Sequence, residues 1–345
     1  MPMDLPGRYF LGANTSEGFF SLYEDFAECG GTFTWYIKGG PGNGKSTFMR
    51  KVARAAEEAG HHVEYIFCSG DPDSLDGIRI RELRTAYVDA TSPHIQEPRL
   101  PGVSGKYIDL SRYYKKDAHW DLERIGRLFR AYRSEYSRAY ALFRASVLSA
   151  SADAMETPDL NPNELFGAAL STLEGQIVSG NSFEERRIFL SAYTCRGFVS
   201  LWDSVDGIEK VYLLDGPRDT KEEFFHRLSQ LCRDRECGMI LCPDPLTPDR
   251  TEGILIPERG ICVLSEPRQI PGKRGRRISL VGKRGTKPRR SRSAGDLALL
   301  KKGMEHLALA KQFHDELEAA YHPCVDFPAL SRFTQSHIKT LLKNE

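Results

Sequence analysis

A glycine-rich stretch near the N-terminus constrains the fold of this chain more than any other feature. Its residues, which fit the pattern G-x-x-x-x-G-K-[ST] and the position after it, are Gly39, Gly40, Pro41, Gly42, Asn43, Gly44, Lys45, Ser46 and Thr47. Glycines at these positions let the backbone turn so tightly that successive N–H groups point toward one anion. The stretch therefore predicts a phosphate-binding loop, with Lys45 reaching the β- and γ-phosphates of a nucleotide and the Ser46 hydroxyl ligating Mg²⁺.

The flanking segments decide whether this match is accidental. Before the loop, residues 32–38 (TFTWYIK) are β-branched and aromatic, as expected of a buried strand. After it, apolar residues recur at helical spacing until Gly60: Phe48, Val52, Ala55, Ala56 and Ala59. A helix beginning at Ser46 would add the positive end of its dipole to the same anion site. This order favours a phosphate site over a glycine-rich turn without a ligand.

Composition indicates a soluble globular protein. The 345 residues leave room for two domains, and 40% of them are hydrophobic and 28% charged. The net charge of +1 gives no general attraction to nucleic acid or to a membrane surface. No apolar run reaches transmembrane length, and the opening MPMDLPGRYF lacks the core of a signal peptide, so we expect a cytoplasmic protein without membrane contact.

The sequence repeats itself. Residues 10–23 return as residues 189–202, with Phe, Leu, Ala, Thr, Gly, Phe, Ser and Leu in register. At a constant spacing, a second set pairs Tyr36, Gly40, Pro41, Lys45, Phe48, Pro72, Asp73, Gly77, Ile78, Ile80 and Glu82 with Tyr212, Gly216, Pro217, Lys221, Phe224, Pro248, Asp249, Gly253, Ile254, Ile256 and Glu258. The pattern predicts a tandem duplication, with one domain over residues 1–180 and a second over 181–345.

Both halves predict the same α/β fold. Strands at 62–68 and 84–89 follow the first loop and its helix, and strands at 238–242 and 260–264 follow the second. Strands alternating with helices indicate a parallel sheet flanked by helices, here two P-loop NTPase-like domains. Long helical segments follow each core, at 117–154 and 296–320, and a shorter helix at 327–342 ends the chain. Residues 157–163 (TPDLNPN) predict a loop.

The helical segment 117–154 carries an aromatic stripe interleaved with arginines. Its apolar positions are Trp120, Ile125, Leu128, Phe129, Tyr132, Tyr136, Tyr140, Phe143 and Val147. Stacking on nucleic-acid bases is one reading of such a stripe. Packing of a long helix against a core is the one that the helical spacing favours.

Asp89 is the best candidate for the carboxylate that holds Mg²⁺ through water, because it ends a hydrophobic strand. The alternative is an aspartate that only opens a turn. Ala90 follows it, where many hydrolytic P-loop ATPases carry a glutamate that activates water. This indicates slow hydrolysis, a base from elsewhere, or transfer to another acceptor. His94 follows the same strand and would sense the γ-phosphate or act as a base, although a loop histidine without such a role is equally compatible. The expected catalytic residues are thus Lys45, Asp89 and His94.

The turn from Asp71 to Gly77 leaves the second strand at its carboxyl end, the edge where open α/β sheets bind ligands. Its aspartates are Asp71, Asp73 and Asp76, and they could bind metal or a substrate hydroxyl. Aspartate and proline are also ordinary turn formers, and the sequence does not decide between the two roles.

The second copy of the loop has diverged. It reads Gly216, Pro217, Arg218, Asp219, Thr220, Lys221 and Glu222. Thr220 replaces a glycine, and Glu222 replaces the hydroxyl residue. Negative charge would now face phosphate, in a backbone with less freedom to turn. Ser265 stands where the first half has Asp89. We expect this half to have lost nucleotide binding and to serve as a scaffold or regulator.

A basic segment interrupts the second half. Residues 271–293 contain no acidic residue and carry Lys273, Arg274, Arg276, Arg277, Lys283, Arg284, Lys287, Arg289, Arg290 and Arg292. Glycine, proline and serine fill much of the rest, so the composition predicts a mobile loop. It could contact a phosphate backbone, but the sequence favours a solvated basic insertion.

These features together resemble a family of uncharacterised bacterial tandem P-loop ATPases, common in spore-forming Firmicutes. The resemblance covers nearly the whole chain. The segments that match family motifs are residues 68–77 (CSGDPDSLDG), residues 89–94 (DATSPH) and residues 314–318 (HDELE). The sequence departs from the family in its second loop, and the basic segment is a local addition. The resemblance implies ATP binding and hydrolysis and names no substrate.

The sequence therefore predicts an ATP-binding protein with GTP as an alternative ligand and Mg²⁺ as the metal. Its first expected activity is an ATPase that switches a conformation or a protein partner. The second is a kinase that phosphorylates a small molecule or nucleotide. The third is a non-catalytic nucleotide-binding regulator, which could touch nucleic acid through residues 271–293.

Overall fold

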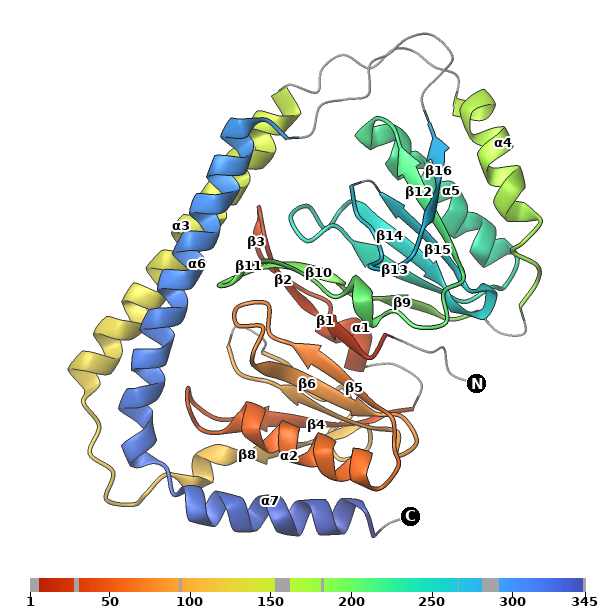
Figure 1. Ribbon diagram of the computed structural model, residues 1–345. Helices are drawn as coiled ribbons and strands as arrows, with labels where there is room; N and C mark the ends of the chain where they lie inside the picture. The colour runs from red at the N-terminus through yellow and green to blue at the C-terminus, as the bar shows by residue number, and fades with distance from the viewer. Residues whose placement is uncertain are drawn as a thin grey trace.

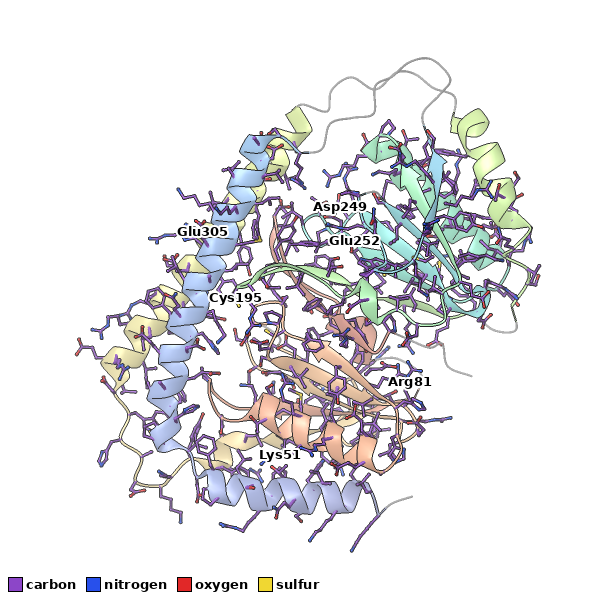
Figure 2. The ribbon with its side chains drawn as sticks, in the orientation of Figure 1. Lys51, Arg81, Cys195, Asp249, Glu252 and Glu305 are labelled. Carbon is purple, nitrogen blue, oxygen red and sulfur yellow. The ribbon has the colours of Figure 1, made fainter. Side chains whose placement is uncertain are left out.

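The computed structural model describes residues 6–27, 31–92, 95–152, 162–180, 183–265, 267–280 and 292–343. Within them the chain forms two six-stranded sheets, two hairpins, and a pair of long helices that spans both halves (Figure 1). Figure 2 shows the side chains on the same ribbon. His94 therefore lies outside the described residues. So do residues 157–161 of the expected loop at 157–163 and residues 281–291 of the basic segment.

Before its last helix, the described part of the first half forms eight strands and three helices. Its strands are β1 (Arg8–Phe10), β2 (Gly12–Thr15), β3 (Gly18–Ser21), β4 (Phe33–Lys38), β5 (Val63–Phe67), β6 (Leu75–Ile80), β7 (Thr85–Asp89) and β8 (Gly105–Asp109). Its helices are α1 (Tyr23–Ala27), α2 (Lys45–Glu58) and α3 (Leu122–Ala152), with a 3₁₀ turn η1 (Leu110–Tyr113) before α3.

The first half ends with helix α4 (Pro162–Glu174), and the second half then repeats this order. Its strands are β9 (Glu185–Arg187), β10 (Ser191–Thr194), β11 (Gly197–Ser200), β12 (Lys210–Asp215), β13 (Met239–Pro243), β14 (Thr251–Ile256), β15 (Ile261–Ser265) and β16 (Gly275–Ser279). Its helices are α5 (Arg218–Asp234), α6 (Ala294–Tyr321) and α7 (Phe327–Leu341), and its 3₁₀ turns are η2 (Trp202–Ser204), η3 (Pro257–Arg259) and η4 (His322–Cys324).

The two large sheets share one strand order, which is compatible with a tandem duplication. The first runs β1-β5-β6-β7-β4-β8, and the second, in equivalent strands, β9-β13-β14-β15-β12-β16. The expected α/β class is confirmed, since both sheets are mostly parallel and are flanked by helices. The prediction needs correction at one strand of each sheet, because β6 and β14 are antiparallel to both of their neighbours. A parallel connection needs a crossover of a dozen or more residues. Between β5 and β6 the chain reverses in a tight turn, in which the Ser74 amide donates to the Asp71 carbonyl at 2.9 Å.

The repeated segment F-L-x-A-x-T-x-x-G-F forms a hairpin in each half, and its threonine and glycine build the turn. The Thr15 hydroxyl donates to the Gly18 carbonyl at 2.8 Å, and Thr194 donates to Gly197 in the same way at 2.9 Å. Both glycines have a positive φ, 113° at Gly18 and 99° at Gly197. The two copies of the segment also meet, since Phe10 and Phe189 exchange backbone hydrogen bonds, each of 2.9 Å.

Replacing Gly18 with alanine is expected to lower the free energy of unfolding by about 1–3 kcal/mol, because side chains rarely adopt this backbone conformation. No atom lies within 4 Å of the added carbon, so the cost is conformational and not steric. Chemical denaturation measures the change. Gly7→Ala, at an exposed glycine without a positive φ, is the matched control and should change stability by less than about 0.5 kcal/mol. Equal stability of both variants would contradict this account of the repeated glycine.

The inner faces of the two sheets share one hydrophobic core. Tyr36 and Ile66 of the first sheet lie in the same cluster as Ile240 and Leu264 of the second. The Phe10 and Phe189 side chains of the β1 and β9 segments also belong to this cluster. The two halves therefore cannot separate without exposing apolar surface from both sheets.

The outer face of each sheet is covered by its own helix and by one from the other half. Helix α7, at the C-terminus, packs on α2, where Leu330 and Phe333 join a cluster with Phe48. Helix α4, which precedes the second repeat, packs on α5, where Phe166 and Leu173 join the second outer cluster. Figure 1 shows both helices at opposite ends of the molecule. The last helix of each repeat is thus exchanged between the halves.

Helices α3 and α6 run antiparallel along the side of both halves (Figure 1). Their contact is close at Gly303 on α6, where an added carbon would lie 2.4 Å from the ring of Phe143 on α3. Phe143 is fully buried, and its ring lies 5.3 Å from that of Tyr193 on β10. The buried part of the aromatic stripe on α3 therefore serves packing. None of the helices in the described residues is both long and apolar enough to cross a bilayer.

Part of the basic segment is ordered, which corrects the prediction of a loop over 271–293. Residues Gly275–Ser279 form β16, which pairs in parallel with β12. Two apolar residues lie within the charged run, Ile278 and Leu280. Both pack with the outer cluster of the second sheet. The predicted loop at 157–163 is also wrong at its end, since Pro162 opens α4, a position where proline fits a helix.

Candidate functional site

The first glycine loop, residues 39–47, connects β4 to α2 as the sequence predicts. Gly42 and Gly44 have φ angles of 62° and 80°, the left-handed region that glycine adopts most easily. Helix α2 begins at Lys45, one residue before the predicted start at Ser46. The N-terminus of this 14-residue helix therefore points its free N–H groups and its positive dipole end into the loop. Within the loop, Asn43 is buried and Thr47 is exposed.

Lys45 and Asp89 lie side by side in the fold, although they are 44 positions apart in the sequence. Strand β7, which ends at Asp89, is the direct parallel neighbour of β4, which leads into the loop. The Lys45 ammonium lies 3.6 Å from a carboxylate oxygen of Asp89 and donates to the carbonyls of Gly39 and Gly40 at 2.9 and 3.0 Å. Both side chains are largely buried, at 13% and 15% exposure. The fold thus brings the expected cation and carboxylate to one edge of the sheet.

Ser46 points toward the neighbouring strand β6. Its hydroxyl oxygen accepts a hydrogen bond of 3.0 Å from the Leu75 amide. Asp89 also has a partner of its own, since one of its oxygens accepts from the Thr91 amide at 2.9 Å. Serine hydroxyls and carboxylates are the oxygen ligands that Mg²⁺ prefers, so the two residues fit the expected metal.

Each of the three aspartates in the turn after β5 is held by the protein. Asp71 lies 3.4 Å from the Lys311 ammonium of α6, and Asp73 forms an ion pair with Arg196 of the β10–β11 turn. Asp76 is buried on β6 beside Cys68 and raises the pKa of that thiol, to which burial contributes most. A structural role therefore accounts for all three, including the contacts between the halves.

The C-terminal end of α6 lies directly over the first glycine loop, which the sequence did not predict. The Gly42 amide donates to a carboxylate oxygen of Glu318 at 3.2 Å. A carbon added to Gly42 would lie 3.0 Å from both the Glu318 β-carbon and its carbonyl oxygen. The Gly40 amide donates to the Tyr114 hydroxyl at 3.2 Å. Only glycine leaves room for these approaches, so the second half closes the loop of the first.

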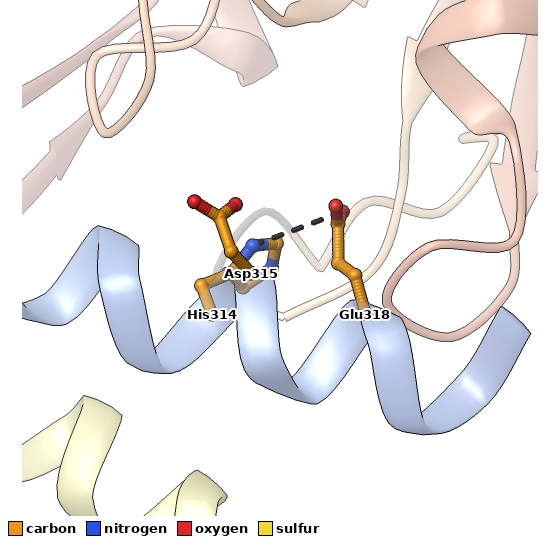
Figure 3. A group of neighbouring side chains, drawn as sticks. All are labelled: His314, Asp315 and Glu318. Carbon is orange, nitrogen blue, oxygen red and sulfur yellow. Dashed lines mark ion pairs between the residues drawn. The ribbon is translucent and has the colours of Figure 1, made fainter.

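Glu318 belongs to a group of three polar side chains on α6 (Figure 3). The ligating atoms of His314, Asp315 and Glu318 all lie within 4.8 Å of one another, and the His314 imidazole is 3.7 Å from the Glu318 carboxylate. Such a group could hold a metal ion, but Asp315 pairs with Lys311. The positive charges of Lys311 and Lys45 also lower the pKa of His314. These positive charges act against a second cation at this group.

Burial dominates the ionisation of the groups around the loop. It lowers the pKa of His314 from its ordinary value, which favours the neutral imidazole near neutral pH. It raises the pKa of Tyr132 on α3, whose ring lies 5.4 Å from that of His314, to about 12. Burial is also the largest cause of the raised pKa of the Cys68 thiol. Tyr132 and Cys68 therefore stay protonated, and the charged groups at the loop are lysines and carboxylates.

The second glycine loop, residues 216–222, is filled by its own side chains. Arg218 stands where the first loop has Gly42 and donates to the Thr247 hydroxyl at 3.0 Å. Glu222 replaces Ser46 and accepts from the Thr251 amide at 2.8 Å, the equivalent of the Ser46 contact with Leu75. Asp219 pairs with Arg250 at 2.9 Å. A phosphate at this loop would meet a carboxylate and an arginine that already have partners within the protein.

Comparisons with models of known protein families, with curated proteins and with solved structures found no match to this chain.

Proposed function

We propose that the first glycine loop binds a magnesium nucleoside triphosphate, ATP or else GTP, and that the chain hydrolyses it to switch a conformation or a partner. The observation that carries this proposal is the meeting of Lys45 and Asp89 beside the N-terminus of α2. An ammonium group, free helix amides and a carboxylate for Mg²⁺ are the parts that phosphoryl chemistry in such a loop requires. The P-loop identity of the two domains is part of the same proposal, as is the resemblance to tandem ATPases.

Hydrolysis is favoured over transfer to a small-molecule acceptor. A kinase needs a group that addresses the acceptor, and the aspartate turn was the candidate. Asp71 and Asp73 are engaged by Lys311 and Arg196, and Asp76 is buried, so the turn presents no free carboxylate. The kinase remains an outcome that the test below distinguishes.

A conformational switch is supported by the contact between Gly42 and Glu318. A phosphate oxygen that accepts from the Gly42 amide must displace the carboxylate now bound there. Since Glu318 lies on α6 of the second half, nucleotide binding would break this contact between the halves. Release of the phosphate would restore it.

Calorimetry is expected to detect one magnesium-dependent nucleotide site per chain. The first glycine loop supplies that site, while Arg218 and Glu222 occupy the second. Titration with Mg·ATP, and with ATP in the presence of a chelator, measures the stoichiometry and the metal dependence. Inorganic phosphate released without an added acceptor supports hydrolysis, whereas nucleoside diphosphate formed only with an acceptor that becomes phosphorylated supports a kinase. Two equal sites, or no binding, would contradict the proposal.

A further inference from the structure

We propose that Glu318 is the carboxylate that takes the proton from the attacking water, so that a helix of the second half completes the catalytic site of the first. This inference rests on the proposed nucleotide hydrolysis. It places on α6 the base that Ala90, the residue after Asp89, cannot supply.

Among the described residues at the end of β7, none is suited to be this base. Ala90 is buried and has no group that can accept a proton. Asp89 lies beside Lys45 and accepts from the Thr91 amide, contacts that suit a metal-holding carboxylate more than a base. In the described part of the chain, Glu318 is the carboxylate that accepts a hydrogen bond from the backbone of the loop itself.

The resting position of Glu318 places it at the phosphate site. Its oxygen accepts from the Gly42 amide at 3.2 Å, and loop amides of this kind are the donors that bind phosphate oxygens. When a triphosphate takes this donor, the carboxylate has to leave it. The backbone of α6 packs against the loop, since a carbon on Gly42 would lie 3.0 Å from the Glu318 carbonyl oxygen. Rotation of the side chain alone would keep Glu318 beside the terminal phosphate.

The surroundings of Glu318 leave its carboxylate within reach of water. Its side chain is 36% exposed. His314 lies one helical turn away with its imidazole 3.7 Å from the carboxylate. Burial lowers the pKa of His314, which favours the neutral ring beside Glu318.

The reaction balances without any further reagent. The water oxygen forms a bond to the γ-phosphorus while the bond from that phosphorus to the β,γ-bridging oxygen breaks. The bridging oxygen keeps the electron pair and leaves as part of the nucleoside diphosphate. One proton of the water passes to the Glu318 carboxylate, which later releases it to solvent. The products are the diphosphate, inorganic phosphate and one proton.

Glu318→Gln is the direct test, because glutamine keeps the shape of the side chain but is not a base. Single-turnover phosphate release at saturating Mg·ATP should slow by at least about 100-fold, the usual contribution of a general base. Nucleotide affinity by calorimetry should be unchanged or higher, because the competing carboxylate is gone. Glu316→Gln, at an exposed position of the same helix, is the matched control and should keep the wild-type rate and affinity.

The outcomes separate this inference from the proposed function. If the wild-type chain hydrolyses ATP and Glu318→Gln does so at the same rate, Glu318 is not the base, while the proposed ATPase stands. If the variant loses affinity but keeps the single-turnover rate, Glu318 only binds nucleotide, and the inference is again overturned. If the wild-type chain binds no nucleotide, or releases phosphate only to an added acceptor, the proposed hydrolysis fails together with it.

Discussion

Replacing Lys45 with alanine is expected to abolish detectable ATP turnover and to weaken Mg·ATP binding strongly. Lys45 is the ammonium group at the mouth of the first glycine loop, and its present partners are the carbonyls of Gly39 and Gly40 and the Asp89 carboxylate. Loss of one preorganised donor to a developing negative charge slows an enzyme by a factor on the order of 10²–10³. Phosphate release and calorimetry measure the two effects.

The equivalent lysine of the second half provides the matched control. Lys221 occupies the same position of the repeat, in a loop that Arg218 and Glu222 fill with their own contacts. Lys221→Ala should therefore keep the turnover and affinity of the wild-type chain. Circular dichroism checks that both variants are folded. Unchanged turnover and affinity in Lys45→Ala would refute every enzymatic reading of the first glycine loop.

Replacing Phe143 with alanine is expected to destabilise the protein by about 3–5 kcal/mol, the usual cost of removing a buried phenylalanine. The ring is fully buried where α3 meets α6 and the β10–β11 hairpin. The two helices touch at Gly303 on α6. A glycine has no side chain that could fill the space left by the ring. A cavity would therefore remain. Chemical denaturation followed by far-ultraviolet circular dichroism measures the change.

Phe129 on the same helix is the control for Phe143, because its side chain is 43% exposed. Phe129→Ala should change the free energy of unfolding by less than about 1 kcal/mol. The comparison tests whether α3 and α6 hold the halves together. Similar stability of the two variants would show that the contact between α3 and α6 contributes little.

The first glycine loop and its flanks could be predicted because their signals are local. The glycines, Lys45 and Ser46 follow one another directly, and the strand and helix beside them have clear patterns. Asp89 was also accessible to sequence reasoning, since it ends a hydrophobic strand, and the structure places it on the strand next to β4. Its metal role stays a prediction, as does that of His94, which lies outside the described residues.

The position of α6 over the first glycine loop could not be predicted, because it depends on contacts between distant segments. Gly42 and Glu318 are 276 positions apart, and no periodicity relates them. The only signal was the match of residues 314–318 to the resembling family, which gave those residues no role. The same limit applies to α4 and α7, because an apolar helix face does not name the surface that it will cover.

Errors within the sheets have a different cause. The antiparallel course of β6 follows from a turn too short for a crossover, and the apolar piece at 77–80 gave no direction. Strand β16 was hidden because arginines at its exposed positions dominate the composition, while Ile278 alone of its residues joins the core cluster. The average charge of a segment conceals a strand in which a single residue packs against the core.

A single half would expose part of its hydrophobic core, because the helix after its glycine loop is covered by the last helix of the other half. The smallest assembly that can fold on this plan is therefore a pair. Under the proposed function, such a pair explains how the second half can carry Arg218 in place of a phosphate-binding glycine and still be retained. What the second half supplies to the first is the pair of helices α6 and α7, which lie against its glycine loop and its helix α2.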